Sequence, residues 1–258
     1  MRLILFAVLL GLAAPLAPAA DNQTDFEVAT IRPHNPDVPG FGMQIRGGRF
    51  TTVATSLSSL IAFAYELHPR QILGATNWVE TEKYDIVAEA GGREEAANRP
   101  AMIRQVQALL TDRFALAFHR ERKRLSVYEI IVGKNGPKFL KNTGDPNANP
   151  TYGFSGLGVM TATNARIANL AVWLQRYVLD RPVVDHTGIL GVYSFNLNWK
   201  ADEFQFSDIA GVLPRSADEA DRSDLYTSIQ QQLGLKLKTT KAQVDVFVID
   251  HVDRPSAN

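Results

Sequence analysis

The sequence contains no cysteine. This absence excludes disulfide bonds, thiolate metal sites and a cysteine nucleophile. It also excludes a lipid-modified cysteine at a signal-peptide processing site. The fold must therefore be held by packing and hydrogen bonding, and any chemistry must come from other side chains.

An excess of charge of one sign is also missing, because 27 basic residues balance 27 acidic ones. Proteins that bind nucleic acid firmly present many basic groups to phosphates. The balanced chain lacks such a broad basic footprint, so we expect no nucleic-acid partner.

Long apolar runs are absent beyond the first residues. Arg2 precedes the short apolar run Leu3–Leu12, and an Ala-Pro-Ala sequence follows. This order is typical of a secretory signal peptide. We predict a signal peptide over residues 1–20, cleaved near Ala19 or Ala20, and a periplasmic or secreted protein; the alternative is an uncleaved anchor. No later stretch reaches the roughly 18 apolar residues of a membrane span, so no transmembrane helix is expected in the mature chain.

The remaining sequence shows an internal repeat. Residues 48–52 and 158–162 are short extended segments, and each leads into a helical pattern. Apolar residues at i, i+3, i+4 and i+7 start at Leu57 and again at Ile167, which is an offset of 110 residues. An alternating strand, a second helix and a hairpin pattern follow in both copies. The same elements in the same order indicate a duplicated unit.

We therefore predict an α+β protein made of two similar small α/β units, each a mixed sheet with about two helices. A stretch rich in Asn, Gly, Asp and Pro separates them, and a polar insertion in the second copy indicates a surface loop. The predicted segments are a first unit with an extra N-terminal strand at 21–140, a linker at 141–156, and a second unit at 157–258 with a loop insertion at 201–224.

Each unit is expected to end in a hairpin, and the first hairpin turn carries the one basic run of the chain. Residues 120–124 form this turn, and residues 239–241 form the second. Arg122, Lys123 and Arg124 are candidate surface contacts for an anionic polymer. The alternative is that they protect a sheet edge or aid solubility.

The tryptophans are not grouped in the sequence. Trp173 and Trp199 lie in apolar patterns and are expected in the core. Trp78 lies in an expected loop, which makes it a candidate surface contact.

Strong catalytic signatures are absent. The glycine-rich stretch around Ser155 does not match the Gly-x-Ser-x-Gly elbow of a hydrolase, and no phosphate-binding loop is present. No two histidines lie three or four residues apart, so no helical metal pair exists. We expect no cofactor and no metal.

Four residues at expected strand ends or turns are the best candidates for acid–base chemistry. They are His119, Glu121, Asp185 and Asp250, which only folding could bring together. The alternative is that the histidine and its neighbours are ordinary hydrogen-bonded surface groups.

Several short motifs together resemble one known family. They include Gly47-Gly48-Arg49-Phe50, Tyr84-Asp85-Ile86, Asp112-Arg113-Phe114, Phe118-His119-Arg120-Glu121, Lys134-Asn135-Gly136-Pro137, Arg181-Pro182-Val183-Val184-Asp185 and Gln232-Leu233-Gly234-Leu235. The chain resembles the Soli-type secreted family of acidobacteria, a domain of unknown function. The resemblance implies export and no established activity. Related domains occur in membrane zinc-peptidase sensors, but this chain lacks their His-Glu-x-x-His motif. The family more often has lysine at His186, which argues against a ligand there.

These observations favour a non-catalytic interaction or binding module of the cell envelope. Its partner would be an envelope protein, a peptide or a glycan, bound where the two units meet. The alternative function is an envelope hydrolase whose acid–base pair is assembled from strand ends.

Overall fold

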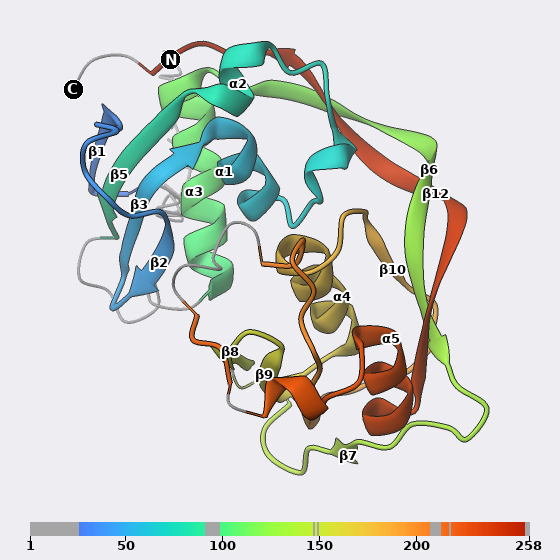
Figure 1. Ribbon diagram of the computed structural model, residues 1–258. Coiled ribbons are helices and arrows are strands. Elements are labelled where there is room, and N and C mark those ends of the chain that lie inside the picture. Colours follow the sequence, from blue (N-terminus) through green and yellow to red (C-terminus); the bar gives the residue numbers. More distant parts are fainter. Residues whose placement is uncertain are drawn as a thin grey trace, which may run out of the picture.

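The computed structural model describes residues 26–90, 99–146, 148, 150–206, 213–216 and 218–255 (Figure 1). The predicted signal peptide and part of the predicted loop at 201–224 lie outside these residues. Helices and three four-stranded sheets make up the described chain, which confirms the α+β class. Among the described residues, no helix has the length and apolar character needed to cross a membrane.

The N-terminal half is built on an antiparallel sheet with the strand order β1-β5-β3-β2. The tight turn between β2 and β3 contains Gly47 and Gly48, whose φ angles are +56° and +79°. Such left-handed angles suit glycine, and residues 43–45 pair with residues 49–51 across this turn. The strands are β1 Val28–Pro33, β2 Gly42–Arg46, β3 Arg49–Ser56 and β5 Lys83–Glu89.

Helices cover this sheet and close its core. The Ser56 side chain caps α1 by accepting a hydrogen bond from the backbone N–H of Ser59 at 3.2 Å. The apolar stripes of α1 and α3 pack on the buried face of the sheet, where Phe50 and Ile86 are fully buried. The helices are α1 Leu57–Ala64, the short 3₁₀ turn η1 Pro69–Gln71, α2 Asn77–Thr81 and α3 Arg99–Phe114.

The C-terminal half has a second antiparallel sheet with the strand order β7-β11-β9-β8. Its core surrounds Trp199, which is fully buried and stacks on Phe206 with ring centroids 5.7 Å apart. The elements are β7 Leu140–Lys141, β8 Thr151–Gly156, β9 Val159–Ala165, α4 Ile167–Tyr177, β11 Tyr193–Asn198, the 3₁₀ turn η3 Glu219–Asp221, α5 Leu225–Ser228 and the π-helical turn η4 Ile229–Leu233.

Two features of this half differ from expectation. The predicted linker at 141–156 contains β8, which pairs along its length with β9. The predicted loop at 201–224 is not wholly a surface loop, because Phe206 within it is buried in the core. An apolar side chain inside a polar stretch is enough to hold it against the sheet.

The two predicted hairpins are wrong. Residues 120–124 and 239–241 lie inside two long strands, β6 Ala117–Val132 and β12 Leu235–His251, which pair with each other in antiparallel register. Figure 1 shows this β6–β12 ribbon running from one half of the molecule to the other. The middle of the ribbon lies between the two cores, and most of its side chains there face water. A run of charges is therefore tolerated without a turn.

Two short strands complete the middle sheet, whose order is β10-β6-β12-β4. The strand β4 Ile72–Leu73 comes from the N-terminal half and runs parallel to β12 at Phe247. The strand β10 Val183–Asp185 comes from the C-terminal half and runs parallel to β6 at Tyr128. The N-terminal half thus contributes β4, which pairs with β12, the long strand that follows the C-terminal half. The C-terminal half contributes β10, which pairs with β6, the long strand that follows the N-terminal half.

The two outer sheets share local irregularities. In β3 the register slips between Thr52 and Thr55. In β9 it slips between Ala162 and Ala165, which lie opposite Phe195 and Tyr193. A left-handed non-glycine residue sits inside each slip, Ala54 with φ +49° or Asn164 with φ +56°. Asn164 lies two residues before Arg166, which is the N-cap of α4.

Candidate functional site

Three of the four acid–base candidates meet on the surface of the β6–β12 ribbon. His119 Nδ1 lies 2.8 Å from Asp250 Oδ1, and its Nε2 lies 3.1 Å from Glu121 Oε1. His119 and Glu121 point to the same side of β6 because they are two residues apart, and Asp250 comes from the paired strand. These hydrogen bonds raise the pKa of His119, and the bond to Glu121 has the larger effect. The same bond from His119, with a second from Lys123, lowers the pKa of Glu121.

This group lies open to water. The His119 side chain is 49% exposed, and none of the three residues lines either cavity described below. Residue 119 is also the third residue of β6 and not the end of a strand. The arrangement can hold a proton, but it offers no enclosed surface on which a substrate would be oriented.

Asp185, the fourth candidate, lies elsewhere. It pairs with Ile130 in the sheet, eleven residues along β6 from His119, or roughly 36 Å along the strand. Its Oδ1 accepts hydrogen bonds from the backbone N–H and hydroxyl of Thr187 at 2.9 and 2.7 Å. Asp185 therefore stabilises a turn. The neighbouring His186 contacts Glu129.

The candidate surface contacts are placed as follows. Arg122 and Lys123 are exposed on β6, where they form ion pairs with Asp245 at 3.7 Å and with Glu121 at 3.0 Å. Arg124 is exposed in the same strand. Trp78 lies in α2 and not in a loop; it is half-buried beneath the guanidinium of Arg254, 5.0 Å from its ring centroid.

A cavity of about 720 Å³ lies where the two halves meet. We call it the junction cavity. Side chains from η1, from β6, and from α4 and the segments that follow it form its walls. The lining residues are His68, Pro69, Tyr128, Gln175, Arg176, Tyr177, Val178, Leu179, Asp180, Arg181, Asp202, Phe204, Gln205, Phe206 and Tyr226.

A hydrogen-bonded group of polar side chains occupies one wall of the junction cavity. The Tyr128 hydroxyl donates to Asp180 at 3.1 Å, and Arg181 Nε donates to the same carboxylate at 3.2 Å. The Arg181 guanidinium also lies 5.6 Å from the Tyr128 ring centroid. Burial raises the pKa of Tyr128. Burial opposes ionisation of Asp180, but the hydrogen bonds from Tyr128 and Arg181 outweigh it and leave the pKa of this carboxyl below its usual value.

His68 lies at the edge of this wall and is held neutral. Its Nδ1 accepts a hydrogen bond from the backbone N–H of Arg70 at 3.1 Å, and the carbonyl of Leu179 provides a second bond. Burial lowers its pKa to about 4. A neutral imidazole whose two nitrogens are both hydrogen-bonded fixes η1 against the C-terminal half. It has no free nitrogen with which to transfer a proton.

The mouth of the junction cavity carries exposed aromatic rings. Phe204 is 81% exposed and Tyr226 is 44% exposed. Large exposed rings beside a concave surface with convergent polar groups are typical of a binding site. Among the residues that the structure describes, no three His, Asp or Glu side chains are grouped to hold a metal ion.

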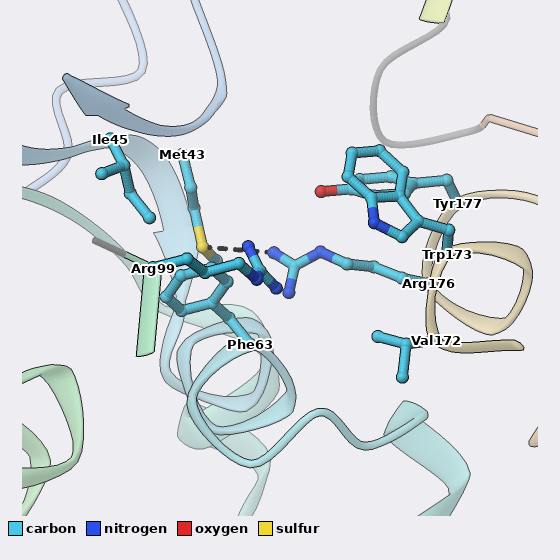
Figure 2. A pocket seen from close by; sticks show the side chains of 8 residues that line it. All are labelled: Met43, Ile45, Phe63, Arg99, Val172, Trp173, Arg176 and Tyr177. Atoms are coloured by element: carbon cyan, nitrogen blue, oxygen red, sulfur yellow. Dashed lines mark hydrogen bonds between the residues drawn. The ribbon is translucent and has the colours of Figure 1, made fainter. Parts of the chain in front are cut away.

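A second pocket of about 200 Å³ opens at the same junction (Figure 2). It is lined equally by both halves of the chain, with Met43, Ile45, Phe63 and Arg99 on one side and Val172, Trp173, Arg176 and Tyr177 on the other. Arg176 and Tyr177 also border the junction cavity. We call this smaller cavity the two-arginine pocket.

The family of the chain is shown by a match to a family model over residues 58–252. The model describes a protein of unknown function, DUF3738, and because it covers most of the chain, the chain belongs to this family. Comparisons with curated proteins and with solved structures give no match.

Proposed function

We propose that this protein is a non-catalytic binding module and that the junction cavity holds its ligand. The observation that carries the proposal is the placement of the cavity, which has walls from both halves of the chain and an aromatic mouth at Phe204 and Tyr226. Its volume of about 720 Å³ lies in the range of small-molecule and short-polymer sites. The hydrogen-bonded Tyr128 and Asp180 supply fixed polar contacts on one wall.

The ligand that best suits these walls is a segment of an extended envelope polymer, either a peptide or a glycan. Both present alternating polar and apolar surface, which the rings of Phe204 and Tyr226 and the carboxylates of Asp180 and Asp202 can contact. The alternative function is a hydrolase that uses His119 with Asp250 or Glu121. The hydrogen bonds among these groups favour it, but their open position outside both cavities argues against it.

Export to the periplasm or cell exterior is part of the proposal, and so is membership of the Soli-type secreted branch. Both rest on the sequence of residues 1–20 and on the motifs described above. Internal duplication is proposed as well. It is supported by matching strand order in the two outer sheets and by register slips near residues 52–55 and 162–165, which are 110 residues apart.

The test is binding of cell-wall fragments to the mature chain. The glycan and the peptide fractions of digested cell wall are added separately, and ligand-induced shifts of the unfolding midpoint are measured. We expect one fraction to raise the midpoint of the wild type, and Phe204→Ser with Tyr226→Ser to abolish the rise. Leu190→Ser is the matched control, because Leu190 is 88% exposed but does not line the cavity.

Two results would contradict the binding proposal. If neither fraction stabilises the wild type, the cavity does not hold this class of ligand. If a fraction is cleaved by the wild type but not by His119→Gln, the hydrolase alternative is correct.

A further inference from the structure

We propose that the two-arginine pocket is a binding site for the carboxylate of a small organic acid that also carries an apolar group. The pocket shares Arg176 and Tyr177 with the junction cavity, but its other six lining residues are different, so this proposal does not depend on the proposed function. It rests on the geometry of two guanidinium groups, on their charge balance and on the walls around them.

Two arginines that are far apart in the sequence point into one pocket. Arg99 lies at the start of α3, and Arg176 lies near the end of α4. Their guanidinium carbons lie 5.4 and 4.9 Å from the centroid of the same ring, that of Phe63. Figure 2 shows both side chains reaching into the pocket from opposite sides. Packing on one ring holds both donors in place before a ligand arrives.

Among the described residues, the positive charge in this pocket is only partly balanced. None of the eight lining residues is acidic. In the described part of the chain Arg99 forms one ion pair, with Glu66 at 3.5 Å. Within the described part of the chain, Arg176 forms no ion pair; its polar contact is a weak hydrogen bond to the Met43 sulfur at 3.4 Å. Two like charges facing one small space favour an anion between them.

The remaining walls are apolar and aromatic. Ile45 and Val172 provide aliphatic surface, and Trp173 and Tyr177 provide rings that pack at 5.0 Å from each other. A ligand that fits must therefore join an anionic head to an apolar body. A volume of about 200 Å³ is smaller than a typical drug-sized site, so the body is one small ring or a short chain.

A carboxylate suits the head group better than a bare inorganic anion. A planar guanidinium donates two parallel hydrogen bonds to a carboxylate, and the apolar walls reward the carbon atoms that a phosphate or sulfate ion lacks. The expected ligand class is thus an aromatic or short aliphatic monocarboxylic acid.

The test uses benzoate and hexanoate as probes of the mature protein, with binding followed by calorimetry and by quenching of tryptophan fluorescence. Benzyl alcohol and inorganic phosphate at equal concentrations separate the two parts of the site. We expect both acids to bind at least tenfold more tightly than either comparison compound. Equal binding of benzyl alcohol or of phosphate, or no binding of the acids at millimolar concentration, would overturn the proposal.

Variants assign the binding to the two arginines. Arg176→Met and Arg99→Met retain the length of the side chain but remove its charge, and each is expected to weaken benzoate binding at least tenfold. Arg104→Met is the control, because Arg104 is exposed on α3 and does not line the pocket. Unchanged benzoate affinity in both test variants would contradict the assignment. If a variant does not fold, the comparison of benzoate with benzyl alcohol on the wild-type protein still tests the proposal.

Discussion

The side-chain amide of Gln175 joins the two halves of the chain: it donates a hydrogen bond to the backbone carbonyl of Glu66, 109 residues earlier, at 2.8 Å. Its oxygen accepts a second hydrogen bond from the backbone N–H of Val183 at 3.0 Å. Gln175 is buried, and its bond to Val183 is shielded from water, whereas its bond to Glu66 is only partly buried. One polar side chain thus satisfies a backbone group just after α1 and another on β10.

Gln175→Leu should destabilise the protein by roughly 1–3 kcal/mol, because it leaves the buried backbone N–H of Val183 without a partner. Urea unfolding measures the free energy change. Gln230→Leu, at an exposed position of η4, is the control and should change stability by about 0.5 kcal/mol or less. A loss below 1 kcal/mol for Gln175→Leu would show that water reaches the backbone N–H of Val183.

The buried imidazole of His68 should make stability depend on pH. Burial lowers its pKa from 6.5 to about 4 in the folded protein. The unfolded chain therefore binds more protons between these values, and stability is lost as the pH falls from about 6.5 towards 4. The full loss is on the order of 3 kcal/mol.

His68→Gln should remove most of this slope between pH 6.5 and 4, as measured by urea unfolding at each pH. His251→Gln is the control, since His251 is 59% exposed, and it should retain the slope of the wild type. Parallel pH profiles for the wild type and His68→Gln would refute a neutral buried imidazole.

The pKa of His119 is shifted in the direction opposite to that of His68, so its effect on stability should have the opposite dependence on pH. Hydrogen bonds that the His119 ring donates to Glu121 and to Asp250, in that order of effect, raise the pKa of His119 above 6.5. The protonated ring is favoured in the folded state, so its contribution to stability is present below the unfolded pKa and disappears as the pH rises through the folded pKa. NMR titration of the ring should show the raised pKa, and Glu121→Gln and Asp250→Asn should each lower it. A pKa at or below 6.5 in the wild type would be inconsistent with these bonds.

Gly158→Ala should be among the most harmful single substitutions. The residue has φ +68°, and an added Cβ would collide with the carbonyl oxygen of Trp199. We expect a loss of roughly 3 kcal/mol or more, because strain and a rigid backbone clash act together. Gly47→Ala provides the matched control: its φ is +56°, but no atom lies within 4 Å of the added Cβ. It should cost about 1–2 kcal/mol, and equal losses at both positions would contradict the clash.

Much of the fold follows from local patterns in the sequence. The alternation at Tyr84, Ile86 and Ala88 marks a strand whose three side chains are all buried. Ser56 indicates a helix start, and Gly234 marks a helix end in the left-handed conformation. These features depend on neighbours in the chain, so periodicity and capping preferences are enough to find them.

The β6–β12 ribbon could not be found in this way. Leu125 to Val132 has the same local pattern in a hairpin as in a strand that pairs with residues 235–242 more than a hundred positions away. The charges at 120–124 favour an exposed turn when only the sequence is considered, but they occupy an exposed stretch of strand between two cores. The choice of partner is set by tertiary packing, which local propensity does not encode.

The proposed binding surfaces do not follow from the sequence for a related reason. Acid and base residue types point to His119 and Asp250, which do meet, but the side chains of Arg99, Arg176 and Phe204 line the cavities. Arginines on amphipathic helices ordinarily face water, and nothing in the sequence distinguishes these two. The aromatic pair Trp173 and Tyr177 beside Arg176 is the one local signal that could have drawn attention to α4.

The pairing of two earlier strands with the late strand β12 has a consequence for the order in which the sheets can form. The partner of both β4 and β6 is β12, the last strand of the chain. Because the chain emerges N-terminus first, whether from a ribosome or from an export channel, its first 234 residues can form the two outer sheets but no completed middle sheet, and β6 lacks its partner β12 throughout that time. Such late, distant pairing slows folding into the range of milliseconds to seconds. Until residues 235–251 emerge, the nascent chain stays open to wrong partners, and it is in this interval that a chaperone would have the most to protect.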